Sequence, residues 1–367
     1  MEILETIPLD SVLPICRSNQ LRKLSDNFQL IQENKDHLIE ESNLDWTNLD
    51  LSKDFEVGSR NVLDINTNQL NEGIEQAKKL DDFYAMAIVY KGRLVAEEYN
   101  EGDADTKYAV WSVTKSVVSA LFGQLIDKNI LQDEFIEIDS FYPLLNDPLK
   151  QKITVRDLLT MSSGIPDNTS YPRENNAIHF ILKKELLYEP GTYWNYTSAG
   201  THVLSDILTQ STGEKAKTFA ETHLFSKLSI SNYTWSEDKE GISNGGYGLL
   251  LQLIDMAKIG QLYLQNGVSN NEVIISSSWI QKSAEMSIPF NSQNSRGYGY
   301  LWWMRLVNGE KMYYAAGYGG QYIMIVPSKA LVIAITSSTR DSGDYGSNLN
   351  RIFYNDIIGS FSSLNAE

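Results

Sequence analysis

Two residue pairs in the 367-residue sequence have the types and spacing of a serine nucleophile with an amine as its base. Ser112 and Lys115 lie in YAVWSVTKSVVSALFGQLID, and Ser236 and Lys239 lie in TWSEDKEG. Side chains three residues apart share one face of a helix, so the amine could take the hydroxyl proton in either place. The pattern alone is weak, because serine and lysine are common enough for about one chance match in a chain this long.

The neighbouring residues distinguish the two pairs. Charged residues surround Lys239, so its ammonium is expected to stay solvated. Apolar and aromatic residues surround Ser112 and Lys115. A serine in a first helical turn lies near free backbone N–H groups that can hold an oxyanion, and a desolvated lysine has a lowered pKa. The alternative is that Ser112 caps the helix and Lys115 extends to solvent, and this stretch alone leaves both interpretations open.

A third candidate nucleophile is Ser243 in GISNG, which matches the G-x-S-x-G turn of α/β-hydrolases. That turn needs a buried strand directly before the serine and a helix directly after it. The preceding SEDKE is too charged for a buried strand. We therefore expect a glycine-rich loop here and keep an α/β-hydrolase-type esterase using Ser243 as an alternative function.

The elements that would position these residues change type along the chain. FYAMAIVYKGRLVAEEYN (83–100) predicts two strands around Lys91 and Gly92. Apolar residues at three- and four-residue spacing predict helices over much of 131–290, one of them capped by Thr154. Aromatic and β-branched runs after 296 predict strands again, with a closing helix near 345–360.

The simplest arrangement is an α+β fold with one antiparallel sheet flanked by helices and built from both chain ends. An all-helical lobe is then inserted between the two halves of the sheet. We expect an N-terminal arm over residues 1–60, a discontinuous α/β sheet domain over 61–130 plus 291–367, and the helical lobe over 131–290.

Composition limits the partners and the compartment. The formal net charge is −16, which repels phosphate backbones and anionic membranes, so neither nucleic acid nor membrane is an expected partner. The single cysteine, Cys16, excludes an intramolecular disulfide, and acidic residues occupy the N-terminal stretch where a secretory signal would be basic and apolar. We expect a cytoplasmic protein acting on a small molecule. Its oligomeric state is left open, a dimer included.

The histidines do not indicate a metal. The chain has four, and they show no metal-binding spacing and no H-E-x-x-H pattern. We therefore predict a site without metal or organic cofactor. The four are His37, His179, His202 and His223.

Three segments, taken in order, resemble one family. SVTK (112–115), YTS (196–198) and AAG (315–317) occupy the places of S-x-x-K, Tyr-x-Asn and Lys-Thr-Gly in the serine β-lactamase and penicillin-binding protein superfamily. TVRDLLTMSSG, LIDMAKIGQLYLQNG, VIISSSWIQKS and YGYLWW are also family-like. The resemblance spans residues 80 to 340 or so. It is nearest to the class C-type branch of esterases, peptidases and amide hydrolases, such as 6-aminohexanoate-dimer (nylon oligomer) hydrolases.

The resemblance implies a β-lactamase-like fold and a serine hydrolase that cleaves an ester or linear amide through an acyl-enzyme. Ser112 would be the nucleophile. Lys115 would accept its proton, directly or with Tyr196, and Tyr196 would pass a proton to the leaving group. The backbone N–H groups of Ser112 and Tyr318 would form the oxyanion hole.

Four further residues are expected to contact the substrate: Ser198, Gly317, Tyr171 and Trp194. Two positions depart from the family pattern. Ser198 replaces an asparagine, and the sequence does not decide whether its shorter side chain reaches Lys115. Ala315 replaces the lysine that would pair with a substrate carboxylate, which argues against penicillin as the substrate. These departures leave open a non-catalytic binding protein on the same fold.

Overall fold

The computed structural model describes residues 44–60, 63–285, 287–289, 296–307, 309–339 and 352–364. Most of the predicted N-terminal arm, with Cys16 and His37, lies outside the described residues. The predicted closing helix lies only partly inside them. Its described part forms two short helical turns, η9 (Ile352–Ile357) and η10 (Ile358–Ser360).

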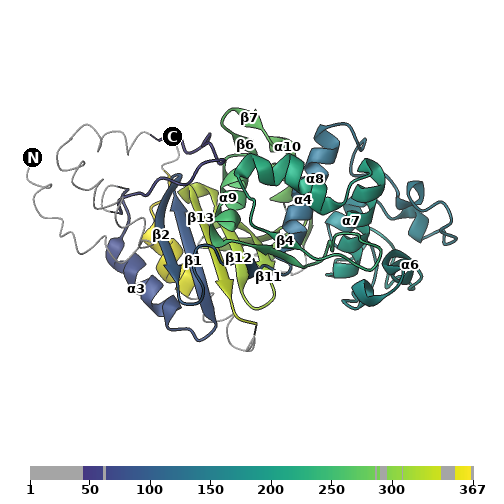
Figure 1. Cartoon of the computed structure of the whole chain (residues 1–367), viewed down its shortest axis with the longest axis horizontal. Helices are drawn as coiled ribbons and strands as arrows, with labels where there is room; N and C mark the ends of the chain where they lie inside the picture. Colours follow the sequence, from purple (N-terminus) through teal and green to yellow (C-terminus); the bar gives the residue numbers. More distant parts are fainter. Residues whose placement is uncertain are drawn as a thin grey trace, which may run out of the picture.

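An antiparallel sheet is the centre of the described molecule (Figure 1). Its strand order is β2-β1-β13-β12-β11-β10-β9-β8, so strands from the two ends of the chain pair with each other. This confirms the predicted α+β, β-lactamase-like sheet built from both chain ends. The strands are β1 (Phe83–Tyr90), β2 (Arg93–Tyr99), β8 (Ile288–Pro289), β9 (Arg296–Tyr298), β10 (Trp303–Val307), β11 (Glu310–Gly317), β12 (Gln321–Val326) and β13 (Leu331–Ser337).

The predicted hairpin at residues 83–100 is present as β1 and β2. Tyr90 pairs with Arg93, which leaves a two-residue turn. The turn residues Lys91 and Gly92 have φ values of 48° and 76°. Two successive left-handed residues match the twist of antiparallel strands, which explains why Lys-Gly closes this hairpin.

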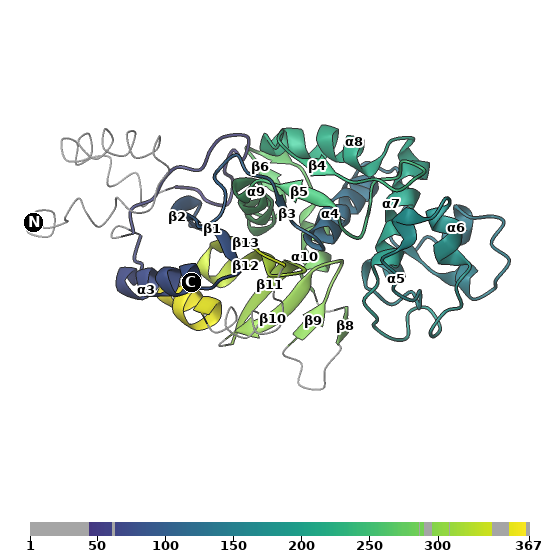
Figure 2. The ribbon, with the colours of Figure 1, turned by 60° about the horizontal axis from the view of Figure 1, so that its bottom comes forward.

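Each face of the sheet has its own layer of helices (Figure 2). Residues of β1 alternate between the two faces, as a period of two requires. Ala85, Ala87 and Val89 pack in the cluster that contains α4 (Val113–Asp127) and α9 (Leu253–Leu264). The opposite cluster contains α3 (Thr67–Lys78), η9 and η10, with Met86, Ile88 and Tyr90.

Helices α5, α6 and α7 lie beyond α4 from β1 and β2 (Figure 2). Strands β4 to β7 also fall within residues 131–290, so the predicted lobe is not all-helical. The predicted cap at Thr154 is confirmed by reciprocal bonds with Asp157. α7 ends at Gly213, whose φ is 75°. Apart from short 3-10 and π turns, the remaining described helices and strands are β3 (Tyr108–Ala109), α5 (Val155–Leu159), α6 (Ala177–Leu182), α7 (Ser198–Thr212), α8 (Ala216–Ala220), β4 (Thr234–Trp235), β5 (Leu249–Leu251), β6 (Val268–Ser269), β7 (Glu272–Val273) and α10 (Ser277–Ser283).

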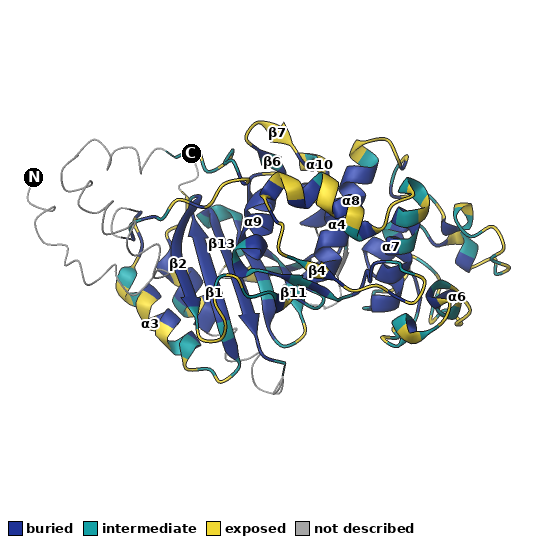
Figure 3. Cartoon of the chain, in the orientation of Figure 1, coloured by how far each residue is buried: buried dark blue, intermediate teal, exposed yellow. Residues whose placement is uncertain are grey.

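Burial explains why α4 lacks a polar stripe in the sequence. Residues Val113 to Leu125 of this helix are all buried (Figure 3). A helix that is apolar on every side is one that other elements enclose. Within the described part of the chain, no helix is both long and apolar enough to cross a bilayer. The domain boundaries at residues 60, 130 and 290 stay predictions.

Candidate active site

Ser112 lies at the start of α4, which the chain enters through a tight turn. Trp111, directly before it, has a φ of 49°, a left-handed conformation that bulky residues rarely adopt. The Ser112 side chain makes no capping hydrogen bond to the helix. Its Oγ lies 3.0 Å from Nζ of Lys115. Ser112 thus occupies the N-cap position of α4, but its side chain does not cap the helix as the alternative required.

Lys115 is enclosed rather than extended to solvent, with only 1% of its surface exposed. Its Nζ has three oxygen neighbours: Ser112 Oγ at 3.0 Å, Ser198 Oγ at 3.1 Å and the Gly246 carbonyl at 2.6 Å. A neutral amine has two N–H groups and one lone pair. The carbonyl can only accept, so it takes one N–H. If Ser198 accepts the other, the lone pair faces the Ser112 hydroxyl.

The surroundings of Lys115 favour this neutral amine. Burial lowers the pKa of Lys115 from 10.5 to about 7, although the negative charge of Asp167 opposes that effect. Desolvation penalises the ammonium, which has no carboxylate near enough to offset it. A base with a pKa near neutrality combines a large neutral fraction with a useful affinity for a proton. Lys115 therefore has the chemistry of a general base toward Ser112.

Tyr196 also neighbours Ser112, with whose hydroxyl it shares a hydrogen bond. It precedes α7 by two residues, because Thr197 caps that helix through the N–H of Gly200. The ring of Tyr196 is centred 4.8 Å from Nζ of Lys115. Burial raises the pKa of the Tyr196 phenol well above its ordinary value, and a hydrogen bond with Ser112 only partly opposes this. Tyr196 is thus a phenol at neutral pH, suited to donate or relay a proton.

Aromatic rings continue from Tyr196 along one side of the site. Its ring stacks on Trp303, with centroids 5.8 Å apart at 22°. Trp194, one of the predicted substrate contacts, lies edge-on to Trp303 at 5.7 Å. Tyr298 closes the group, 4.9 Å from Trp303. These four residues, Trp194, Tyr196, Tyr298 and Trp303, are called the aromatic wall below.

Ser198 reaches the amine despite its short side chain. It is the first residue of α7, and its backbone N–H donates to Oδ1 of Asp167 at 2.6 Å. Its Oγ, 3.1 Å from Nζ of Lys115, occupies the place where an amide was expected. The carboxylate of Asp167 is thereby held beside the catalytic lysine candidate, which explains its effect on the lysine pKa.

The end of β11 passes directly beside the entry to α4. A Cβ on Gly317 would lie 2.2 Å from the Val110 carbonyl, so only glycine permits this approach. The next residue, Tyr318, has its ring 5.6 Å from that of Trp111. Ala315 is fully buried, so no cation stands where the family has a lysine. The assignment of the Ser112 and Tyr318 N–H groups to an oxyanion hole stays a prediction.

Tyr171 is placed differently from the loop position over the cleft that the sequence suggested. Its side chain is fully buried. Its hydroxyl donates to Oδ1 of Asn244 at 2.5 Å, and its ring stacks on His202 with centroids 4.5 Å apart. These contacts make it a support of the site, and a direct contact with substrate stays a prediction.

The other serine candidates lack a catalytic setting. Ser243 is fully buried and its Oγ accepts the Lys217 N–H. The next regular element after Ser243 is a strand, β5, rather than a helix, so the α/β-hydrolase turn is not formed. Lys239 is exposed and donates to Asn175 Oδ1 at 3.1 Å, as expected for a solvated lysine.

Two residues of the site were not predicted from the sequence. Gly246 supplies the carbonyl nearest to the lysine amine, and Asp167 supplies the neighbouring charge. Gly246 lies directly after the GISNG stretch, whose glycines indicated a loop but not its partner. Asp167 follows the SSGIP turn, and nothing in the sequence places it opposite the start of α7. Both contacts join segments far apart in the chain.

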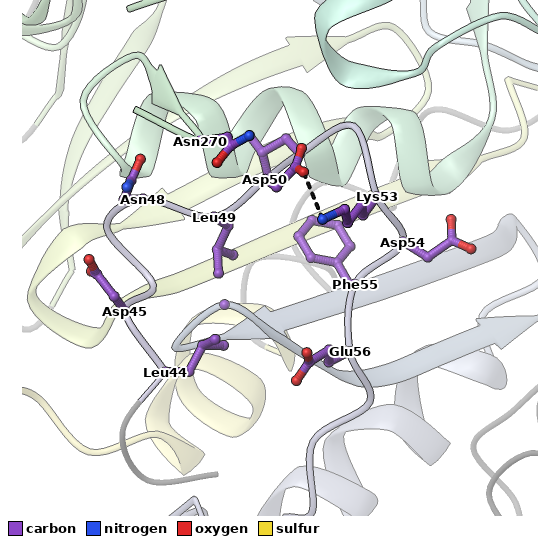
Figure 4. Close-up of a pocket in the computed structure, with 12 residues that line it drawn as sticks. Leu44, Asp45, Asn48, Leu49, Asp50, Lys53, Asp54, Phe55, Glu56 and Asn270 are labelled. Carbon is purple, nitrogen blue, oxygen red and sulfur yellow. Dashed lines mark ion pairs between the residues drawn. The ribbon is translucent and has the colours of Figure 1, made fainter. Parts of the chain in front are cut away.

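No candidate metal centre is found among the described residues. No cluster of three or more histidine, cysteine, aspartate or glutamate side chains in the described ranges is placed to hold a metal ion. A separate hollow of about 380 Å³ lies between residues 44–56 and the turns at Gly92 and Asn270 (Figure 4). Its lining has as many apolar as acidic side chains, and Lys53 pairs with Asp50 at 3.1 Å. It contains none of the residues around Ser112.

Comparison with known sequences identifies the family. The sequence model of the β-lactamase family matches residues 83–353, well over half of the chain. A 6-aminohexanoate-dimer hydrolase from Paenarthrobacter ureafaciens is 25% identical over 291 residues, which cover 70% of this chain and 73% of the relative. The matched range contains every predicted site residue.

Solved structures show the same fold. A candidate 6-aminohexanoate-dimer hydrolase from Bacillus anthracis superposes with a TM-score of 0.71 at 21% identity, covering 85% of this chain and 88% of that one. An octameric penicillin-binding protein homologue from Pyrococcus abyssi gives 0.64 at 21% identity, covering 77% and 76%. With the sheet, the buried lysine and the family match together, the chain belongs to the β-lactamase family and is a hydrolase of that family.

Proposed function

We propose that the chain is a serine hydrolase that cleaves an ester or linear amide bond through an acyl-enzyme on Ser112. One observation carries the proposal: the buried amine of Lys115, with its pKa near 7, lies 3.0 Å from the Ser112 hydroxyl. Activation of a serine requires a base within hydrogen-bond distance whose pKa suits the working pH. Lys115 meets both conditions.

The first half-reaction forms the acyl-enzyme. Ser112 Oγ attacks the carbonyl carbon while Lys115 accepts the hydroxyl proton. The bond to the leaving amine or alcohol then breaks, and Tyr196 protonates the departing atom and regains a proton from Lys115. Because burial keeps Tyr196 protonated, we assign it the role of donor rather than of initial base. The negative charge on the substrate oxygen would be held by the N–H groups of Ser112 and Tyr318.

The second half-reaction returns the enzyme. A water molecule attacks the acyl carbon and gives its proton to the same Lys115 and Tyr196 pair. The bond to Ser112 Oγ breaks, the serine recovers a proton, and the carboxylic acid product leaves. Every proton stays among the substrate, water and these three side chains, so no cofactor is required by the scheme.

The lining of the site favours an uncharged or apolar acyl group. The aromatic wall offers flat apolar surface beside Ser112. Fully buried Ala315 offers no charge to a substrate carboxylate. The name of the Paenarthrobacter relative, a hydrolase of a linear amide dimer, supports linear amides as one substrate class. We therefore propose small esters and linear amides ahead of penicillins.

A pair of serine variants tests this function. Ser112→Ala is expected to lose at least about a thousandfold in kcat toward p-nitrophenyl butyrate, because the hydroxyl that forms the proposed acyl-enzyme is removed. Ser243→Ala is expected to keep wild-type activity within about twofold. A fluorophosphonate should label Ser112 alone, as read by peptide mass spectrometry.

Opposite results would select the alternatives. Wild-type activity in Ser112→Ala would remove Ser112 as the nucleophile, and a folded but inactive Ser243→Ala that also loses fluorophosphonate labelling would move the nucleophile to Ser243. If wild-type protein neither turns over the ester nor takes the fluorophosphonate, the chain is a binding protein on a hydrolase fold.

A further inference from the structure

A second buried polar pair lies below the site and has no part in the scheme above. His202 follows Ser198 by four residues on α7, so the two lie one helical turn apart. Its Nε2 lies 2.9 Å from Oδ2 of Asp238, and neither side chain has any solvent exposure. A buried ionisable pair of this kind is costly to desolvate and needs further partners to be tolerated.

Those partners fix which ring nitrogen carries the hydrogen. The backbone N–H of Gly245 donates to Nδ1 of His202, with the nitrogens 3.4 Å apart. An amide N–H can only donate, so Nδ1 must present its lone pair. The hydrogen of the neutral ring therefore lies on Nε2, where it donates to Asp238.

Asp238 is itself held in one orientation. Its Oδ1 accepts the backbone N–H groups of Glu240 and Ile242, each at 2.9 Å. Burial works against the charge of Asp238, but the bonds from His202 and these two amides outweigh it, and the pKa of the carboxyl lies below its usual value. Oδ1 is thus committed to the backbone, and Oδ2 alone faces the imidazole.

The imidazole in turn supports the chain segment that holds the catalytic lysine, because the Gly245 N–H and the Gly246 carbonyl flank the Gly245–Gly246 peptide on its two sides. Gly245 directly precedes Gly246, whose carbonyl accepts the 2.6 Å hydrogen bond from Lys115. A Cβ on Gly245 would lie 2.1 Å from the Thr201 carbonyl, so this peptide rests directly on α7. Displacing it would free one N–H of Lys115 and let the amine turn its lone pair away from Ser112.

We propose that His202 and Asp238 are positioning residues that hold the Gly245–Gly246 peptide and so orient the Lys115 lone pair toward Ser112. The proposal rests on the proposed function, because it assigns these residues to that reaction. It predicts that the site depends on the direction of the hydrogen bonds in the pair. A pair that only filled space would tolerate any substitute of equal shape.

Asp238→Asn tests this direction without changing shape. The amide oxygen must take the Oδ1 position to accept the two backbone N–H groups, which leaves the NH2 group facing His202 Nε2. Nε2 then has to accept, so the ring hydrogen moves to Nδ1 and opposes the Gly245 N–H. We expect kcat to fall about ten- to a hundredfold, with KM within about twofold of wild type, because two buried donors face each other.

The matched control is Glu237→Gln. Glu237 neighbours Asp238 in the same loop but pairs with Lys215 at the surface, 2.8 Å away. This variant should keep wild-type kcat.

A second pair of variants tests the proposal even if Asp238→Asn folds poorly. His202→Asn keeps an acceptor near the Gly245 N–H, whereas His202→Leu removes it. Activity should therefore be higher in His202→Asn than in His202→Leu.

The decisive readout is the histidine tautomer, measured by NMR on protein labelled with 15N-histidine. His202 should show the Nε2–H form in wild type and in Glu237→Gln, and the Nδ1–H form in Asp238→Asn. Protection of the Gly245 amide from hydrogen exchange should fall in Asp238→Asn and should not fall in Glu237→Gln. An unchanged tautomer, or a changed tautomer with wild-type kcat, would overturn the proposal.

The same measurements separate this inference from the proposed function. If wild-type protein hydrolyses no ester and takes no fluorophosphonate at Ser112, the function fails, whatever the NMR shows. If wild-type protein is active but the tautomer and the Gly245 protection do not respond to Asp238→Asn, only the positioning role fails.

Discussion

At the scale of single residues, the central fact is that Lys115 bonds to oxygens but forms no ion pair within the described part of the chain. Its nearest neighbours are two hydroxyls and the Gly246 carbonyl. Hydroxyls and carbonyls solvate an amine weakly compared with water, so burial there makes the ammonium unstable. The same burial that would make a lysine a poor core residue gives it a free lone pair at neutral pH.

The pH dependence of kcat/KM follows from this balance. Only the neutral form of Lys115 can accept the serine proton, so kcat/KM should rise with pH and level off above pH 7, where its pKa lies. Asp167→Asn keeps an oxygen that can accept the Ser198 N–H but removes the charge that raises the lysine pKa. The rise should therefore move to lower pH in this variant.

The measurement is a pH–rate profile of ester hydrolysis between about pH 5 and pH 9. Asp157→Asn is unsuitable as a control, because the Asp157 side chain takes part in capping α5. Asp105→Asn is a suitable control, because Asp105 is not among the groups that change the pKa of Lys115 or Tyr196. A profile of Asp167→Asn that moves to higher pH, or a wild-type rate that falls as pH rises through 7, would contradict the assignment of Lys115 as base.

At the scale of elements, α4 is the helix that positions Ser112 and Lys115. Two polar groups of α4 bond to distant segments: Ser116 Oγ donates to the Leu301 carbonyl, and the Ser119 carbonyl accepts from the Trp279 indole. The apolar sequence of α4 predicted that the helix is buried. It could not predict these partners, because they come from residues 160 and 185 positions away.

The same limit applies to the site itself. Ser112 and Lys115 share one helical turn, so their proximity follows from local geometry and was predictable from sequence. Tyr196 and Ser198 were found only through the resemblance to a family. Neither local geometry nor the resemblance identified Gly246, because it contributes a backbone carbonyl and residue type does not indicate where a backbone group will bond. Residue type predicted the chemistry, and the fold decided which backbone groups complete it.

Close packing of α9 on the sheet gives a test of element scale. A Cβ on Gly260 would lie 2.6 Å from Val332 Cγ1 and 2.7 Å from Ile323 Cγ2. Alanine favours helix over glycine by about 1 kcal/mol, but overpacking of a core costs about 1–3 kcal/mol. We expect Gly260→Ala to lower the free energy of unfolding by about 1–2 kcal/mol in urea denaturation.

A double-mutant cycle identifies the cause. In a Val332→Ala background, which removes one of the two close methyl groups, Gly260→Ala should cost less by about 0.5 kcal/mol or more. Equal costs in the two backgrounds would show that the packing of α9 on β13 is not what excludes a side chain at Gly260.

At the scale of the whole molecule, two ends of the chain close one sheet and the intervening segments bring the rest of the site to α4. The sequence predicted an antiparallel sheet with strands from both chain ends, because the alternation of side chains and the turn signals that indicate strands are local. It did not predict that Ala315 would be fully buried beside α4. Without a lysine at that position, the long-range field of the net charge, −16, is the charge effect that we expect on the approach of a substrate.

This net charge predicts how ionic strength changes the rate. Three p-nitrophenyl esters with acyl chains ending in trimethylammonium, methyl and carboxylate differ mainly in charge. As salt rises from 0.01 to 0.15 M, the screening length falls from about 30 to about 8 Å, which weakens steering by the protein field. We expect kcat/KM to fall for the cationic ester, to rise for the anionic one, and to stay constant for the neutral control. A fall for the anionic ester would reveal a cationic group in the cleft and would contradict the interpretation of Ala315, because attraction of a carboxylate is the role that the missing lysine would have had.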